Sequence, residues 1–239
     1  ANSKAELLEA TEAAGVPVPR TILCRSPKDI EDAARAFGYP HEVFVIKPAV
    51  SSGSRGFRVV RPQTKSLRAF LDEKPDSTTC SLEDLVSIMS SGEMPLMLAS
   101  EYLPGPEYSV DIFRSADRFE AVPRRRTSIR TGISNVTELV DAPDMISQSE
   151  TISSTVGLEG VFGLQFKENS EGEYRLLECN PRVQGTMVAS LLGGFNMVWA
   201  GVCHSRGLPV QANGVTSRQG TYYRYWAGLG AVGGKRTMA

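Results

Sequence analysis

RLLECNPRVQGTM, residues 175–187, places an acid, an amide and a guanidinium at the end of one predicted strand. The three side chains, Glu178, Asn180 and Arg182, stand at every second position. Because strand side chains alternate between two faces, this spacing points all three groups to the same side. Such a concentration of polar groups at one strand end calls for a ligand or a special structural role.

The stretch GVFGLQFKENSEGEYRLLECN, residues 160–180, predicts a β-hairpin that turns at NSEG. If Glu168 pairs with Glu173 across the turn, Gly163 lies opposite Glu178. The glycine leaves space on the polar face where a side chain would otherwise stand. The predicted hairpin therefore has an open region next to its acid.

In this register Gln165 is the diagonal neighbour of Glu178 and shares its face with Asn180. Oxygen donors from one carboxylate and two amides suit a hard cation such as Mg²⁺, which needs few protein ligands when phosphates complete its shell. The alternative is a solvated strand face. Arg182 fits that alternative poorly, because arginine suits phosphate or carboxylate oxygens.

Lys47 ends an apolar strand and is followed by the small-residue segment AVSSGSRG, residues 49–56. Backbone N–H groups of such a loop can approach phosphate oxygens closely, while the ammonium neutralises charge. The segment is not a P-loop, because it lacks G-K-[ST] and a strand follows it. An ordinary hairpin tip is the competing interpretation.

A third candidate is LMLASEYLPGPEYSVDIF, residues 96–113, in which an apolar strand meets a rigid Pro-Gly-Pro segment. Backbone groups around Glu101–Leu103 could bind the edge of a base, and Glu107 could accept hydrogen bonds from ribose hydroxyls. The alternative is a connector between two subdomains. The two interpretations are compatible, because ligands favour clefts at such junctions.

Composition narrows the class of protein. The chain has 239 residues, 41% of them hydrophobic, and a net charge of −1, which argues against a dedicated nucleic-acid or anionic-membrane surface. Its four cysteines are scattered without a C-x-x-C pair, which predicts free thiols in a reducing cytosol. No apolar run approaches the ~20 residues of a membrane span. We therefore expect a soluble cytoplasmic protein without nucleic-acid or membrane partners.

Periodicity and capping residues predict a mixture of helices and hairpins, which indicates an α+β fold rather than a parallel βαβ array. The predicted helices cover residues 3–15, 26–38, 64–74, 81–92 and much of 186–207. The longer segment over 73–93 is expected to cover a nucleotide. The arginine-rich segment VPRRRTSIRTG, residues 122–132, is expected to form a local anion clamp.

Taken together, four motifs resemble the ATP-grasp superfamily, most closely its carbamoyl-phosphate-synthase-like branch, over roughly residues 1–210. They occur in the family's order: VIKPAVSSGSRG (45–56), SEYLPGPEYSVD (100–111), GLQF (163–166) and ECNPRVQGT (178–186). Four ordered motifs make a far more specific signal than any one of them.

The resemblance implies roles for individual residues. Lys47 would contact the α- and β-phosphates, and Arg182 would face the transferred phosphoryl group. Lys4 would be an earlier phosphate contact, although Ser3 replaces the family's usual acid. The implied nucleotide contacts are Lys4, Lys47, Ser52, Gly53, Ser54, Glu101, Tyr102, Leu103, Glu107 and Gln165. The implied metal ligands are Gln165, Glu178 and Asn180, and the implied catalytic residues are Lys47, Asn180 and Arg182.

The resemblance also implies an architecture. A linking helix over 1–19 would precede two α+β subdomains, 20–98 and 99–212, that clamp ATP, and residues 213–239 would form a C-terminal strand and tail. The family's preceding Rossmann-like domain, which helps to form the acceptor site, is expected to be absent from this chain. Another domain or subunit, or a homo-oligomer, would then complete the site.

The implied chemistry is an ATP- and Mg²⁺-dependent ligation, with Mn²⁺ as an alternative metal. The γ-phosphoryl group would pass to a carboxylate or bicarbonate, and an amine would attack the resulting acyl phosphate. We expect one of Arg124, Arg125, Arg126 or Arg130 to bind the acid substrate. Two alternatives are a non-catalytic ATP-binding regulatory module and the ATP-grasp subunit of a split carbamoyl-phosphate synthase.

Overall fold

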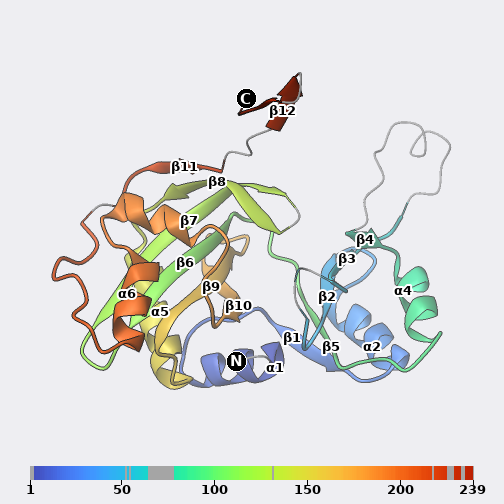
Figure 1. Cartoon of the computed structure of the whole chain (residues 1–239). Coiled ribbons are helices and arrows are strands. Elements are labelled where there is room, and N and C mark those ends of the chain that lie inside the picture. Colours follow the sequence, from blue (N-terminus) through green and yellow to red (C-terminus); the bar gives the residue numbers. More distant parts are fainter. Residues whose placement is uncertain are drawn as a thin grey trace.

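The computed structural model describes residues 3–51, 53, 55–63, 78–130, 132–216, 218–224, 229–232 and 235–238. These residues form a mixed five-stranded sheet and an antiparallel six-stranded sheet that lie side by side, each with its own helices, and a separate two-stranded pair (Figure 1). The predicted α+β class is confirmed.

The first sheet has five strands in the order β1-β5-β2-β3-β4. Strands β2 and β3 form the predicted antiparallel hairpin. The strands are β1 (Thr21–Cys24), β2 (Phe44–Pro48), β3 (Arg58–Val60), β4 (Thr79–Cys80) and β5 (Met97–Glu101). Helices α2 (Pro27–Phe37) and α4 (Leu82–Met89) cover one face, where a core that includes Ile30, Phe44 and Leu85 is buried.

Local sequence explains where these helices begin. The Ser26 side chain accepts from the Asp29 backbone N–H while the Asp29 carboxylate accepts from the Ser26 N–H, which completes a capping box. Ser81 likewise accepts from the Asp84 N–H at 3.0 Å and starts α4. The predicted helix over 64–74 lies outside the described residues.

The second sheet has six strands in the order β10-β9-β6-β7-β8-β11. The arginines of the segment 122–132 lie on its longest strand, β7, which was not predicted from the sequence. The strands are β6 (Glu107–Arg114), β7 (Phe119–Arg130), β8 (Ile133–Leu139), β9 (Gly160–Glu168), β10 (Tyr174–Asn180) and β11 (Thr221–Tyr223).

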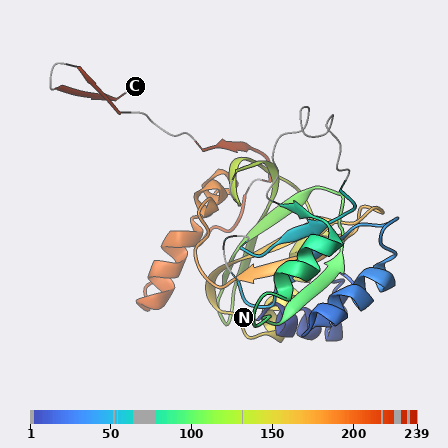
Figure 2. The same ribbon diagram turned by 90° about the vertical axis from the view of Figure 1, so that its right-hand side faces the viewer.

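Each face of the second sheet packs against a different set of helices (Figures 1 and 2). Helices α1 (Lys4–Ala13) and α5 (Pro143–Thr155) lie on one face, over a core that includes Val110, Phe162 and Leu164. The 3₁₀ helix η1 (Met187–Gly193) and helix α6 (Met197–Ser205) cover part of the other face.

That second face changes from apolar to polar along β6. Phe113 packs in the cluster under η1 and α6, whereas Asp111, Ser109 and Glu107 follow at alternate positions on the same side. The even-numbered residues, such as Val110, remain in the other core. The helices therefore cover only the apolar end of this face, and polar groups gather at its other end.

The four cysteines are buried free thiols, as expected. Strands β12 (Leu229–Val232) and β13 (Lys235–Met238) pair with each other and lie apart from both sheets (Figure 2). Within the described ranges, no single helix has the length and apolar character of a membrane span. The bent pair η1 and α6 meets the same criteria only when the two are counted together.

Candidate functional site at the junction of the two sheets

The strand pair β9–β10 contains a β-bulge that changes the predicted register. Glu178 lies directly opposite Gln165, and Asn180 lies opposite Gly163, with the irregularity between Leu176 and Glu178. The prediction that Gly163 faces Glu178 is therefore wrong. A bulge adds one unpaired residue to a strand, here Leu177, and so shifts every later partner.

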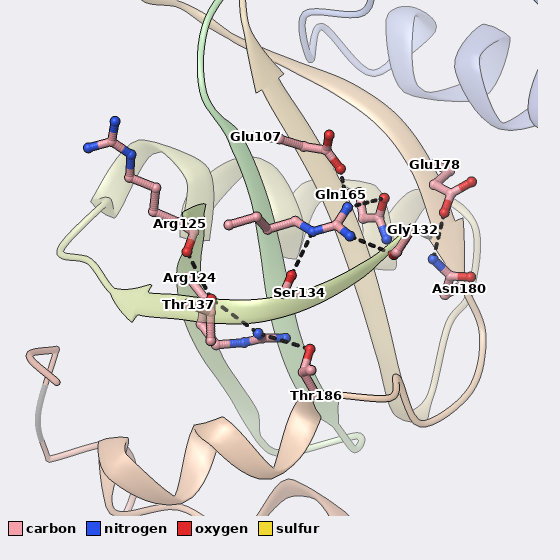
Figure 3. Close-up of polar contacts among 11 residues, drawn as sticks. Glu107, Arg124, Arg125, Gly132, Ser134, Thr137, Gln165, Glu178, Asn180 and Thr186 are labelled. Atoms are coloured by element: carbon pink, nitrogen blue, oxygen red, sulfur yellow. Dashed lines mark hydrogen bonds and ion pairs between the residues drawn. The ribbon is translucent and has the colours of Figure 1, made fainter. Parts of the chain in front are cut away.

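Glu178, Asn180 and Arg182 form a short chain of contacts at the end of β10. Asn180 Nδ2 donates to Glu178 Oε1 at 2.9 Å, as Figure 3 shows, and Arg182 Nη2 donates to Asn180 Oδ1 at 3.4 Å. Cys179 points to the opposite face and joins the core, as alternation requires. The guanidinium, amide and carboxylate are therefore ordered along the strand end.

Lys47, on β2 of the first sheet, contacts the end of β10 in the second sheet. Its Nζ donates to the carbonyl of the bulged residue Leu177 at 3.5 Å, across 130 positions of sequence. The side chain is buried, and burial, together with the charge of Lys4, lowers the pKa of Lys47 to about 8, against the opposing effect of Glu178. The buried ammonium of Lys47 is therefore close enough to both Lys4 and Glu178 to be influenced by their charges.

Lys4 is held over the loop that follows β2. Its backbone N–H donates to the Ala49 carbonyl at 2.9 Å, and its Nζ donates to the Ser51 carbonyl at 3.0 Å and hydroxyl at 3.2 Å. Gly53 has φ +63, a left-handed conformation that favours glycine. Ser52 and Ser54, which the sequence analysis assigned to the nucleotide, lie outside the described residues.

The Pro-Gly-Pro segment is packed tightly against the second sheet. The Gly105 N–H donates to the Glu168 carbonyl at 3.1 Å, and a Cβ on Gly105 would lie 2.5 Å from Glu168 Cβ. Leu103 is buried and Tyr102 is half-exposed, with the Lys167 ammonium 5.8 Å from its ring centroid. The segment Glu101–Leu103 therefore forms a fixed connection between β5 and β6.

Glu107 is engaged by an arginine from the neighbouring strand. The Arg126 Nη1 forms an ion pair with the Glu107 carboxylate and also donates to Gln165 Oε1 at 3.3 Å. Glu107 and Gln165 lie next to each other in Figure 3. Glu107 was expected to bind the ribose and Gln165 the metal. The guanidinium of Arg126 contacts both side chains.

The other arginines of this segment are distributed between the two sides of the sheet. Arg124 is completely buried and forms a two-bond pair with Asp111, at 2.7 and 2.8 Å. Arg125 is exposed and points away from the site (Figure 3). Because Arg124 and Arg126 are enclosed and paired with protein acids, the expectation that one of them holds the acid substrate gains no support.

Arg124 also reaches the loop that follows β10. Its Nη1 lies 3.3 Å from the hydroxyl oxygens of both Thr137 and Thr186 (Figure 3). Thr186 directly precedes η1 and ends the polar motif that contains Arg182. A buried cation on β7 therefore anchors the loop on which Arg182 stands.

The sequence analysis missed Gln184. Its side chain is buried, and its Nε2 has no hydrogen-bond partner among the described residues. A Cβ on Gly163 would lie only 2.1 Å from this nitrogen, so the amide occupies the space that the glycine leaves open. The signal was present in the sequence, because Gln184 stands two positions after Arg182, as Arg182 does after Asn180.

The donor set at the strand end fits a hard cation. Glu178 supplies a carboxylate, Asn180 adjoins it, and Gln165 faces it across the hairpin, all on one side of the sheet. Oxygen ligands of this kind suit Mg²⁺ when phosphate oxygens and water supply the remaining positions. The two lysines nearby favour the phosphates themselves.

Comparison with known proteins agrees with this geometry. The 2-oxoglutarate carboxylase biotin carboxylase domain of Hydrogenobacter thermophilus, solved with MgADP and bicarbonate, is similar with a TM-score of 0.70 and 16% identity, over 92% of this chain and 49% of that one. The N5-carboxyaminoimidazole synthetase of Staphylococcus aureus, solved with ADP, gives a TM-score of 0.68 and 16% identity, over 88% and 52%. These likenesses define an ATP-grasp fold.

The family follows from sequence. The model of the family described as "ATP-grasp in the biosynthetic pathway with Ter operon" matches residues 93–228, more than half of the chain, and the chain belongs to this family. The carbamoyl phosphate synthase large chain of Methanothrix thermoacetophila is 25% identical over 199 residues, which are 78% of this chain and 17% of that relative. The chain thus spans only a part of the relatives that it matches.

Proposed function

We propose that the site binds ATP with a divalent cation and activates a carboxylate by phosphoryl transfer. The observation that carries this proposal is the contact between Lys47 Nζ and the carbonyl of Leu177, the residue next to Glu178. It places a lysine of the first sheet beside the residue that precedes the proposed metal ligand Glu178 on the second sheet. Family membership supports the same conclusion.

In this proposal each sheet supplies part of the nucleotide site. Lys4 and Lys47 neutralise the phosphates, Glu101–Leu103 receive the adenine, and Glu107 accepts from the ribose. Glu178 and Asn180, with Gln165, hold Mg²⁺, which would neutralise charge on the phosphate oxygens. Glycine and serine groups of the loop over 49–56 are proposed to cover the phosphates.

The proposed reaction has two steps. An oxygen of the carboxylate substrate attacks the γ-phosphorus of ATP, the bond to the β-phosphate oxygen breaks, and ADP and an acyl phosphate form. An amine then attacks the acyl carbon, inorganic phosphate leaves, and the nitrogen loses a proton. Arg182 is proposed to face the moving phosphoryl group, and Gln184 to face the acid, because its buried amide nitrogen has no hydrogen-bond partner among the residues that the structure describes. Such chemistry depends mainly on position and charge neutralisation.

Calorimetry tests the nucleotide half of the proposal. ATP should bind in the presence of Mg²⁺ and much more weakly without it, while NAD should not bind and GTP should bind less well. Glu178→Gln should remove the metal dependence, whereas Glu173→Gln, an exposed acid at the turn of the same hairpin, should leave it unchanged. Equal binding of GTP, or binding that ignores Mg²⁺, would contradict the assignments.

Acid-dependent release of ADP tests the catalytic half. A panel of small carboxylic acids, and bicarbonate, is added with an amine to the protein and Mg-ATP. Arg182→Ala should reduce any stimulated rate more than it weakens ATP binding, because its partner charge develops during transfer. Nucleotide binding without stimulated release from any acid, even after a preceding Rossmann-like domain is supplied in cis or in trans, would favour the non-catalytic regulatory module. Stimulated release that requires bicarbonate together with separate synthase subunits would favour the split synthase subunit.

A further inference from the structure

Arg126, on β7, joins two of the proposed ligand residues, Glu107 and Gln165. Its side chain is only 5% exposed. The guanidinium uses all three of its nitrogens: Nε donates to Ser134 Oγ at 2.9 Å, Nη2 to the Gly132 carbonyl at 2.7 Å, and Nη1 to Glu107 and Gln165. The group is therefore held from four directions.

The acceptors belong to separate parts of the fold. Glu107 begins β6, Gln165 lies on β9, and Gly132 and Ser134 belong to the connection and start of β8. A planar guanidinium with fixed donor directions can satisfy such a set at once, whereas a lysine ammonium presents its donors from a single point. Arg126 thus fixes the position of Glu107 relative to the rest of the sheet.

Glu107 itself remains partly open. Its side chain is 22% exposed, and Arg126 engages one of its two carboxylate oxygens. A carboxylate can accept several hydrogen bonds, so the same group can still accept from a ligand hydroxyl. Without its anchor, the long Glu side chain would have to lose rotamer freedom each time a ligand bound.

We propose that Arg126 is a positioning residue that holds Glu107 for the ribose and thereby sets the preference of the site for ribose hydroxyls. The inference rests on the proposed function, since it takes Glu107 as the ribose acceptor. The residues that hold Arg126 in place, Ser134 and Gly132, then contribute to ribose recognition without touching the nucleotide.

The preference between ATP and its deoxy analogues separates this role from a general structural one. Loss of Arg126 leaves Glu107 as an uncompensated negative charge near the nucleotide, so the affinity for every nucleotide should fall. A fall common to ATP, 2′-deoxy-ATP and 3′-deoxy-ATP cancels in the ratio of their dissociation constants. Only an effect on the hydroxyl contacts changes that ratio.

The experiment measures the three dissociation constants in the presence of Mg²⁺ for the wild type and a set of variants. The test variants are Arg126→Met, Arg126→Lys and Ser134→Ala, and Glu107→Gln removes the acceptor itself. Arg125→Met is the matched control, because this neighbouring arginine is exposed and faces the other side of the sheet. Circular dichroism establishes that each variant is folded before its ratio is used.

The wild type should prefer ATP to at least one deoxy analogue by about tenfold, as expected for a hydrogen bond to a charged group. Glu107→Gln and Arg126→Met should lose most of that preference, and Arg125→Met should keep it. If Arg126→Met does not fold, Arg126→Lys and Ser134→Ala decide the question, and both should show a reduced preference.

Each other outcome has a definite meaning. A folded Arg126 variant that keeps the wild-type preference overturns the positioning role, while Glu107 remains the ribose acceptor. A wild type that binds Mg-ATP without any preference overturns the inference but leaves ATP binding intact. A wild type that binds none of the three nucleotides overturns the proposed function.

Discussion

Lys47 is a buried lysine whose proton is held less tightly than usual. Burial and the neighbouring Lys4 lower its pKa to about 8, so the ammonium is mostly protonated at neutral pH and loses its proton at mildly alkaline pH. The phosphates of a bound nucleotide would supply the missing counter-charge and raise this pKa again. Nucleotide binding should therefore be coupled to protonation of Lys47.

We predict that the affinity for Mg-ATP falls as the pH rises from 7 to 9. Below pH 8 the free protein already holds the proton, and above pH 8 binding has to take one up, so affinity decreases by up to about tenfold for each further pH unit. Calorimetry in buffers of different ionisation enthalpy measures the proton uptake directly. Lys47→Arg, which stays charged throughout this range, should flatten the dependence, and an unchanged slope would contradict the assignment.

The same pKa has a separate consequence for stability. The folded-state pKa of Lys47 lies below the ordinary lysine value of 10.5, so the unfolded chain binds the proton more tightly. The resulting cost to stability is fully present below about pH 8. It disappears as the pH rises from 8 toward 10.5, the opposite of what a lysine with a favourable partner would give.

At the scale of elements, the pair Arg124–Asp111 joins β6, β7 and the loop before η1. Both side chains are completely buried, and burial raises the pKa of Asp111 while Arg124 opposes that rise. Removal of one partner from such a pair is more harmful than removal of both, because a buried charge is then left without compensation.

Arg124→Met should lower the free energy of unfolding by about 3–5 kcal/mol at neutral pH. The loss in free energy of unfolding caused by Arg124→Met should become smaller as the pH falls, because a protonated Asp111 carries no buried charge. The double variant with Asp111→Leu should recover part of the loss, and Arg125→Met should change the free energy by less than about 0.5 kcal/mol. Urea unfolding measures all four proteins. Equal effects of Arg124→Met and Arg125→Met would contradict the structural role.

In the β9–β10 hairpin, Gly163 leaves room for a side chain from another part of the chain. Gly163 leaves the space that the Gln184 amide occupies, and an added Cβ would lie 2.1 Å from Nε2 and 2.4 Å from Cδ. The far end of the Gln184 side chain would have to move. The backbone of the hairpin need not change.

Gly163→Ala should therefore cost about 1–3 kcal/mol in stability, as overpacking commonly does. Because Gln184 is proposed to face the acid, acid-stimulated release of ADP should fall more than the affinity for ATP. Gly92→Ala is the control, since nothing lies within 4 Å of its added Cβ and its φ is not positive. If acid-stimulated release of ADP and the affinity for ATP fell by the same factor, Gln184 would not act on the acid.

At the scale of the whole molecule, the proposed ligand bridges two sheets with separate cores. The first core includes Phe44 and Ile46, and the second includes Val110 and Leu164. Lys47 and Lys4 come from the first sheet and helix α1, while Glu178 comes from the second sheet. A ligand that contacts all of these elements stabilises their arrangement as well as each element.

We predict that Mg-ATP at a hundredfold excess over its dissociation constant raises the free energy of unfolding by about 2.7 kcal/mol. For a chain of this size that corresponds to roughly 5–10 °C in the unfolding temperature. Differential scanning fluorimetry with and without Mg²⁺ measures the shift. Glu178→Gln should abolish most of it, whereas a shift that persists in this variant would place the metal elsewhere.

The sequence by itself determined the α+β class, the β2–β3 and β9–β10 hairpins, and the residues of the polar strand end. These features depend on local patterns: alternation, turn residues and capping side chains, which act over a few neighbouring positions. Glu178 and Asn180 are two residues apart in the chain, so their shared face follows from strand geometry alone. The family's order of motifs identified the superfamily on the same local evidence.

Only the tertiary structure decided the register at Glu178, the partners of Arg124 and Arg126, and the position of Gln184 against Gly163. The bulge at Leu177 has no turn residue to mark it, and it shifts Gln165 from a diagonal to a direct neighbour of Glu178. The strand that carries Arg124 and Arg126 was not predicted from the sequence, and which acids they meet depends on how β6, β7 and β9 align. These pairings join residues far apart in the chain, and their free energy depends on burial, which sequence spacing does not specify.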